Sequence, residues 1–332
     1  MSEFWAVTCY YNSEQDHCRV HNFKLFAERL KKQGVSLLTV ELVVDDKDKG
    51  NPDVESLSTK YHRVVHPDVL WSKEALVNVG FKLLPPECTK VCWIDADILF
   101  PFDDDWATKC SAALDKHKVV QPFEKYFFMP ERHVKSGLWD DERYPEDYRL
   151  GFAGNYAHGR QTNDFSKAHP GYAWAARRSV IEEIGGLYDK GICMADVLMA
   201  YGFIAKTEED IKEIWEYEPM KAVFGLWGPR LRGHVEDWMR KTIKVVGGDV
   251  GVVDGVRVHH LFHGSIIHRK YKALHQAYAE YNPYTDSRIN ADGVLEWTEE
   301  APQSLKNRAK AYMSVRQKAN TRYRPQPTTR QS

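Results

Sequence analysis

The stretch VCWIDADILFPF, residues 91–102, places two carboxylates inside an apolar run. The run reads as a buried strand, in which alternate side chains share a face, so Asp95 and Asp97 are expected to point the same way. Two ionised carboxylates this close repel each other and lose hydration on burial. A divalent cation between them and a ligand makes the arrangement favourable. The stretch therefore predicts a cation site at a strand end, and the alternative is that the acids open a turn into Pro101.

The segments around this run alternate between strand patterns and helix patterns. Compact apolar runs predict strands, and apolar residues at helical spacing predict helices. The expected strands are 4–11, 36–44, 61–67, 90–98 and 118–123, and the expected helices are 19–34, 72–85 and one that starts at 103–105. Strands that are apolar on both faces and alternate with helices indicate a parallel sheet covered by helices. We therefore predict an α/β fold with a Rossmann-like, mostly parallel central sheet.

The second half of the chain has fewer clear patterns. Residues 124–168 lack a clear period, which is typical of a functional or mobile segment. A strand leading into a helix is expected over 172–186, and a hairpin that turns at Asp254-Gly255 is expected over 250–264. A further helix is expected over 268–281, before a helical tail.

Charge and cysteine content limit the class of protein. The net charge is −1, so nothing global points to nucleic acid or membrane. The tail 301–332 carries eight basic residues and no acid, and it is either a solvated tail or a contact for an anionic partner such as DNA. The six cysteines form no C-x-x-C pair, which favours a reduced, intracellular setting over a zinc knuckle. With no signal-peptide pattern and no apolar run of about 20 residues, we expect a soluble cytoplasmic protein, in a host cytosol if the source is a virus.

The order of these segments resembles the GT-A glycosyltransferases over roughly residues 3–275. TCYYNSEQ resembles that family's first nucleotide-binding loop, VVDD its second, and WSKEALVNVGF the helix before its metal-binding strand. In that family a D-x-D motif holds Mn²⁺ or Mg²⁺ against the diphosphate of a nucleotide sugar. The resemblance therefore implies that Asp95 and Asp97 serve a metal site, with Asp95 reaching the ribose or the metal through water.

The resemblance also implies a nucleotide-sugar site and a third metal ligand. The implied binding residues are Thr8, Tyr10, Asn12, Asp45, Lys73, Asp95, Arg269 and Lys270. Stacking on Tyr10 and a carboxylate at Asp45 favour uracil, while Arg269 and Lys270 either neutralise the departing diphosphate or are ordinary surface cations. Several family members complete the metal shell with a C-terminal histidine, often before a glycine, which implies His263 here. His259 is held in reserve because 259, 261 and 263 share a face on a strand, and a structural histidine is the alternative.

The segment HPGYAWAARRSVIEEIGGLYDKGICMADVLMAYG, residues 169–202, resembles the acceptor side of the family. An acid before its last helix is the catalytic base of inverting members, and Asp196 holds the matching position. The family usually has a pair such as Glu-Asp there, whereas this chain has Ala195-Asp196. An N-cap for the following helix is the alternative role, and it is compatible with a base.

The implied organisation is a GT-A domain over 1–290 with a basic extension over 291–332, and residues 1–123 and 124–290 form nucleotide-sugar and acceptor halves. The implied reaction is metal-dependent hexosyl or pentosyl transfer from a nucleotide sugar, UDP favoured, to a hydroxyl of a glycan or a hydroxylated DNA base, with inversion. A mixed oxygen and nitrogen ligand set suits Mn²⁺ best, with Mg²⁺ as the second choice.

Two other functions stay open. A sugar nucleotidyltransferase would need a glycine-rich loop that CYYNSEQDHCR lacks, and a non-catalytic carbohydrate- or nucleotide-binding protein would bind without turnover.

Overall fold

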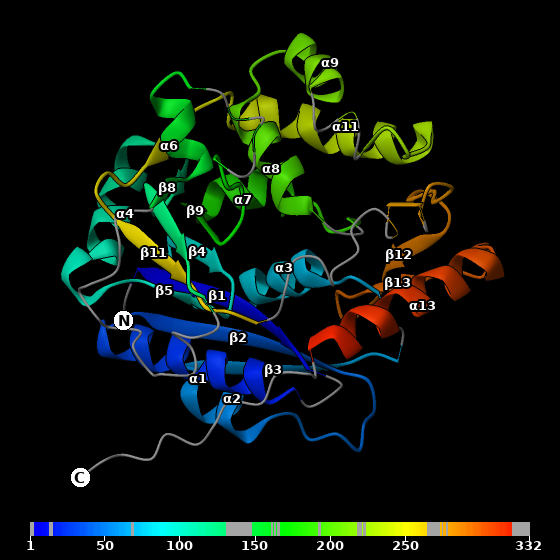
Figure 1. The fold of residues 1–332 in the computed structure, drawn as a ribbon, viewed down its shortest axis with the longest axis horizontal. Helices are drawn as coiled ribbons and strands as arrows, with labels where there is room; N and C mark the ends of the chain where they lie inside the picture. The colour runs from blue at the N-terminus through cyan, green and yellow to red at the C-terminus, as the bar shows by residue number, and fades with distance from the viewer. Residues whose placement is uncertain are drawn as a thin grey trace.

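The computed structural model describes residues 3–320, apart from 13–15, 68–69, 131–147, 161, 163, 165–166, 192–193, 218–220, 222–223, 264–272, 274 and 277. Its centre is a seven-stranded sheet with helices on both faces (Figure 1). The strands, in spatial order, are β10 (Val250–Val252), β6 (Val119–Gln121), β9 (Ala173–Arg177), β4 (Lys90–Ile94), β1 (Phe4–Tyr11), β2 (Ser36–Val43) and β3 (Lys60–Val65). Only β9 runs antiparallel to its neighbours, so the predicted mostly parallel α/β sheet is confirmed.

Alternation along the strands divides the core between the two faces of this sheet. Trp5 and Val7 of β1 join one buried cluster, while Phe4 and Ala6 join the other. The Phe4 side packs against α1 (His17–Lys32), α2 (Pro52–Leu57) and α4 (Trp106–Lys116). The Trp5 side packs against α3 (Lys73–Leu83), α6 (Phe152–Ala157), α7 (Arg178–Ile184), α8 (Ala195–Ile204), α9 (Glu208–Glu216) and α11 (Pro229–Val245). Of these helices, α1, α3, α4 and α7 lie where the sequence patterns predicted a helix, whereas α2, α6 and α11 had not been predicted in the sequence analysis.

Helix α3 lies close to the sheet because of one glycine. A Cβ atom at Gly80 would lie 2.5 Å from Val7 Cγ1, a distance that side chains do not tolerate. Ser72 occupies the N-cap position but makes no capping hydrogen bond with its side chain. Lys73, the first residue of α3, lies near Trp93 and Asp95 at the end of β4.

A second, smaller sheet has the order β5 (Ile98–Leu99), β11 (Arg257–His260), β7 (Lys125–Phe128) and β8 (Arg149–Leu150). The expected hairpin over 250–264 is wrong, because β10 pairs with β6 in the large sheet whereas β11 pairs with β5 and β7. Gly255 does adopt the positive φ of a tight turn, at +74°. The turn therefore passes the chain from one sheet to the other instead of closing a hairpin.

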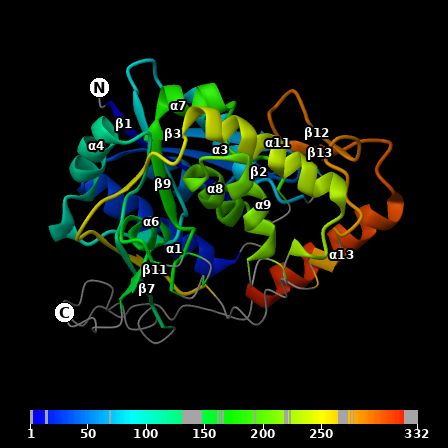
Figure 2. The same cartoon turned by 90° about the horizontal axis from the view of Figure 1, so that it is seen from above.

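The C-terminal elements lie together at one end of the molecule. They are the hairpin of β12 (Ser287–Ile289) and β13 (Leu295–Trp297), and α13 (Gln303–Asn320), and they lie away from α4 and α6 (Figure 2). Leu305, Ala309 and Tyr312 of α13 belong to the same buried cluster as Trp5 and Val7 of β1. A short 3-10 helix, Phe102–Asp104, precedes α4. No helix among the described residues is long and apolar enough to cross a bilayer.

Candidate active site

The two carboxylates of the opening motif lie just beyond a strand. β4 ends at Ile94, Asp95 leads into a turn at Ala96-Asp97, and β5 begins at Ile98. The prediction of one strand over 90–98 with both acids on one face is therefore wrong. Asp95, Ala96 and Asp97 are each half-buried. The turn stands at the carboxyl end of an interior strand, where α/β sheets collect ligands, and it gives the two acids different neighbours.

Asp97 faces two histidines. Its Oδ2 atom lies 3.3 Å from His263 Nε2 and 3.8 Å from His260 Nε2, and the two nitrogens are 3.2 Å apart. The pairing of β11 with β5 sets this geometry, because His260 lies opposite Ile98 and the amide of Leu261 donates to the Asp97 carbonyl at 2.8 Å. One oxygen and two nitrogens within 4.8 Å of one another can hold a cation.

The donor set of Asp97, His260 and His263 fits a divalent transition metal. A carboxylate with neutral imidazoles suits Mn²⁺, Fe²⁺ or Zn²⁺ better than Ca²⁺, which prefers oxygen ligands only. Three protein ligands leave further coordination positions for a bound molecule. The family resemblance had implied His263, with His259 in reserve, and had not implied His260.

His259, the reserve ligand, lies elsewhere. Its Nε2 atom is 2.5 Å from the Tyr148 hydroxyl, and its ring packs on Phe127. Neighbouring residues on β11 point to opposite faces, and the strand ends at His260, so strand alternation does not continue to His263.

Asp95 pairs with Lys73 instead of joining the two histidines. Their Nζ and Oδ1 atoms are 2.5 Å apart. Burial acts to lower the pKa of Lys73, but the charges of Asp95, Glu74 and Asp196 outweigh it and raise that pKa. The raised pKa favours the charged ammonium form of Lys73, which lines a pocket.

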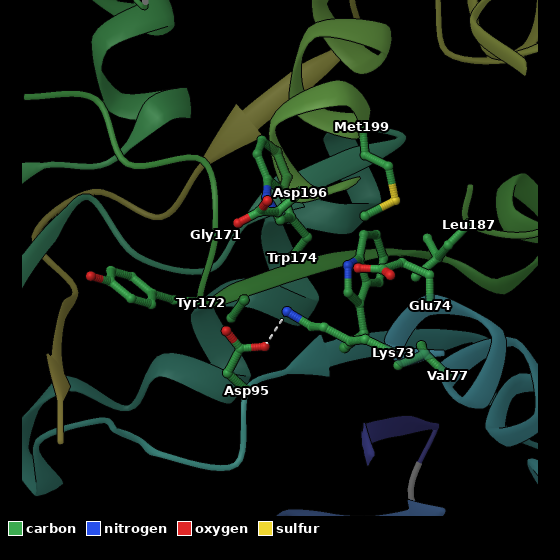
Figure 3. Close-up of a pocket in the computed structure, with 12 residues that line it drawn as sticks. Lys73, Glu74, Val77, Asp95, Gly171, Tyr172, Trp174, Leu187, Asp196 and Met199 are labelled. Carbon is green, nitrogen blue, oxygen red and sulfur yellow. Dashed lines mark ion pairs between the residues drawn. The ribbon is translucent and has the colours of Figure 1, made fainter. Parts of the chain in front are cut away.

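The pocket beside this ion pair combines charged groups with apolar walls (Figure 3). Lys73 points across it to Asp95, and the carboxylates of Glu74 and Asp196 also line it. The remaining lining residues are Val77, Trp93, Gly171, Tyr172, Ala173, Trp174, Leu187 and Met199. A small, partly apolar pocket strengthens electrostatic interactions, because little water screens them.

Asp196 lies in the first turn of α8. Met194 is the N-cap residue, so the alternative role of Asp196 as the N-cap is wrong. The Asp196 Oδ1 atom accepts from the Val197 amide at 3.0 Å. A Cβ atom at Gly171 would lie 2.6 Å from Asp196 Oδ2, so a side chain at this position would displace the Asp196 carboxylate. Burial raises the pKa of Asp196, Lys73 lowers it and Asp95 raises it again. The net rise makes Asp196 a better proton acceptor than an ordinary aspartate.

Glu74 is a pocket carboxylate that sequence reasoning missed. Its side chain is 4% exposed and accepts from Trp71 Nε1 at 3.2 Å. Burial raises the pKa of Glu74 to about 7, against the opposing charge of Lys73. An acid in the first turn of a helix has many structural uses, so the sequence carried no signal for this role.

The raised pKa of Glu74 predicts a pH-dependent stability. The folded chain binds this proton more tightly than the unfolded chain. The contribution of protonated Glu74 to folding stability is therefore fully present below about pH 4.5, and it is lost as the pH rises through about 7. Glu74→Gln should remove this dependence. The difference in free energy of unfolding, variant minus wild type, should rise by about 3 kcal/mol from pH 4.5 to pH 8. Urea unfolding at both pH values measures the gain. Glu183→Gln, at an exposed site on α7, is the control, and a difference that does not change with pH would contradict the assignment.

The remaining predicted nucleotide residues divide into three groups. Thr8 and Tyr10 are buried in β1, where Thr8 Oγ1 donates to the Ile94 carbonyl at 2.7 Å and Tyr10 packs on Phe23. Asn12 and Asp45 follow the ends of β1 and β2, and each bonds its own loop. Arg269 and Lys270 lie outside the described residues. The side chains of Thr8 and Tyr10 are thus buried and make contacts within the protein core.

Comparison with known proteins gives distant structural likenesses only. No protein-family model and no curated protein sequence matches the chain. The solved structure of Staphylococcus aureus TarS 1–349 has a TM-score of 0.40 at 11% identity, over 91% of this chain and 98% of that one. Glucosyl-3-phosphoglycerate synthase from Mycobacterium tuberculosis, in complex with Mn²⁺, UDP and phosphoglyceric acid, has a TM-score of 0.37 at 11% identity, over 89% and 86%.

Two further solved structures are also distantly similar to this chain. The chain covers 33% of a longer TarS structure, with a TM-score of 0.37 at 12% identity over 60% of this chain. It also matches 4-diphosphocytidyl-2C-methyl-D-erythritol synthase from Anaerococcus prevotii, with a TM-score of 0.32 at 14% identity over 83% of this chain and 99% of that one.

Proposed function

We propose that this protein is a metal-dependent glycosyltransferase of the GT-A type, which moves a sugar from a nucleoside-diphosphate sugar, a UDP-sugar by preference, to a hydroxyl acceptor. The observation that carries the proposal is the grouping of Asp97, His260 and His263 at the carboxyl end of β4, next to the pocket of Asp196. A cation site and a buried carboxylate at one sheet edge are the two elements that such a transfer needs.

The roles of the residues follow from where negative charge develops. A divalent cation, Mn²⁺ by the choice of ligands, would neutralise charge on the departing diphosphate when bound. Asp97, His260 and His263 would hold it. The Lys73 ammonium, fixed by Asp95 at 2.5 Å, supplies a second positive charge beside the same edge. Asp95 in this proposal orients Lys73, and any contact it makes with ribose or metal goes through water.

Asp196 is the proposed general base. It would accept the proton of the incoming hydroxyl while the bond between the sugar and the diphosphate breaks, which inverts the anomeric centre. Trp93, Trp174 and Met199 shield the pocket, so water competes less with the acceptor for the sugar. Asn12 and Asp45, beyond the ends of β1 and β2, are the residues left to meet the nucleobase.

The test is release of a nucleoside diphosphate from a panel of UDP-, GDP- and dTDP-sugars with Mn²⁺. We expect slow hydrolysis of at least one donor, with UDP-sugars hydrolysed faster than the others. EDTA should stop the release of diphosphate, and excess Mn²⁺ should restore it. The acceptors tested should include oligosaccharides and DNA containing hydroxymethylated bases. An acceptor that the enzyme can use should speed the release of the nucleoside diphosphate. No diphosphate from any donor would contradict the proposal.

The alternatives give different products in the same assay. A sugar nucleotidyltransferase would make pyrophosphate from a nucleoside triphosphate and a sugar phosphate, and a binding protein would retain a donor without cleaving it. A nucleic-acid acceptor gains no support from the described part of the tail. There Lys306 donates to the Thr298 carbonyl at 2.8 Å, and Arg308 pairs with Glu280 at 3.0 Å.

A further inference from the structure

Tyr172 has an unusual backbone for a bulky residue. Its φ is +79°, which places it among three non-glycine residues with positive φ in the described part of the chain. For a large side chain this left-handed region is unfavourable, and residues held there cluster at functional sites. The conformation directs the Tyr172 carbonyl to the Asp95 amide, which donates to it at 2.8 Å. A glycine could make that turn without strain, so the tyrosine ring needs its own explanation.

The ring stacks on two imidazoles. Its centroid lies 3.9 Å from that of His169, with an angle of 2° between the planes, and 5.0 Å from that of His260, with an angle of 30°. Tyr172 is 5% exposed, and Figure 3 shows its side chain pointing away from the Lys73–Asp95 pair. Phe128 adds an edge contact to His260, with centroids 5.3 Å apart. The imidazole of His260 therefore contacts one ring from β7 and one from the residue that precedes β9.

The residues just before Tyr172 contact the proposed base. The Gly171 amide donates to His169 Nδ1 at 3.0 Å, which orients the outer ring of the stack. Gly171 itself lies so close to Asp196 that a Cβ would be 2.6 Å from Oδ2. The segment 169–172 thus contacts Asp196, the turn that carries Asp97, and His260.

We propose that Tyr172 is a positioning residue, whose ring holds the His260 imidazole in the orientation that binds a cation together with Asp97 and His263. This inference rests on the metal site of the proposed function. A stacked ring restricts rotation of His260 about its side-chain bonds, so His260 is arranged before a cation arrives. Residues that orient metal ligands change metal affinity without touching the metal.

The test is Mn²⁺ affinity of the full-length protein without nucleotide, measured from the electron paramagnetic resonance of free Mn²⁺. Tyr172→Phe keeps the ring and should bind within about twofold of wild type. Tyr172→Gly, and Tyr172→Asn as a second variant that tolerates positive φ, should bind about ten- to a hundredfold more weakly. Tyr312→Ala removes a buried tyrosine from α13, and it should lower stability while leaving Mn²⁺ affinity unchanged.

The outcomes separate this inference from the proposed function. Wild-type affinity in the folded Gly and Asn variants overturns the role of Tyr172 and leaves the metal site intact. Absence of Mn²⁺ binding by the wild-type protein overturns the metal site and this inference together. Weaker binding in Tyr172→Gly but not in Tyr172→Phe or Tyr312→Ala supports stacking as the cause.

Discussion

Asp97→Ala is expected to abolish Mn²⁺ binding and to lower Mn²⁺-dependent release of UDP by about a thousandfold or more. Asp97 is the one carboxylate facing His260 and His263 in the described cluster, so its loss leaves two neutral nitrogens and no charge to balance the cation. A thousandfold loss corresponds to about 4 kcal/mol of transition-state stabilisation, within the range that a metal ion supplies. Calorimetric titration with Mn²⁺ and a coupled UDP assay measure both effects.

A matched series of variants makes this result specific. Asp292→Ala, at an exposed turn between β12 and β13, should leave both readouts unchanged. His260→Ala and His263→Ala should each weaken Mn²⁺ binding, whereas His259→Ala should not, because His259 contacts Tyr148 instead. Full Mn²⁺-dependent activity in Asp97→Ala would contradict the assignment of the metal site.

Asp196→Asn is expected to lower the rate constant of sugar transfer by about a hundred- to ten-thousandfold, the usual contribution of a positioned general base. Asparagine keeps the size of the side chain and can still accept from the Val197 amide, so the first turn of α8 should be unchanged. Mn²⁺ affinity should stay at the wild-type value, since Asp196 lies in the pocket and not among the metal ligands. Rates with saturating donor and acceptor separate these effects.

The pH profile checks the same role. Burial raises the pKa of Asp196, so wild-type activity should fall as the pH drops through a value above that of an ordinary aspartate. Asp196→Asn should lose that acidic limb along with most of its rate. An unchanged rate would place the base elsewhere and would remove the support for inversion.

Local sequence patterns predicted the positions of helices and strands better than they predicted which strands pair with one another. β1, β2 and α1 were predicted to within about two residues because each has one clear hydrophobic period. Sheet order depends on contacts distant in sequence, and the antiparallel insertion of β9 between β4 and β6 left no local signal. The turn at Asp254-Gly255 was correctly identified, but its chemistry does not say which sheet receives the next strand.

The candidate site was predicted in part for similar reasons. Asp97 was found because a carboxylate inside an apolar run is costly unless it has a partner. His260 was missed because strand alternation pairs His259 with His263, whereas the chain leaves β11 after His260. Thr8 and Tyr10 looked available at a strand end, but the strand continues to Tyr11 and buries both.

The most direct test of the central claim is a crystal structure of the protein soaked with Mn²⁺ and UDP, with anomalous data collected at the manganese edge. We predict an anomalous peak within bonding distance of Asp97, His260 and His263, with the diphosphate of UDP on its open side and Lys73 nearby. Manganese bound elsewhere, or UDP bound away from the carboxyl end of β4, would contradict this account.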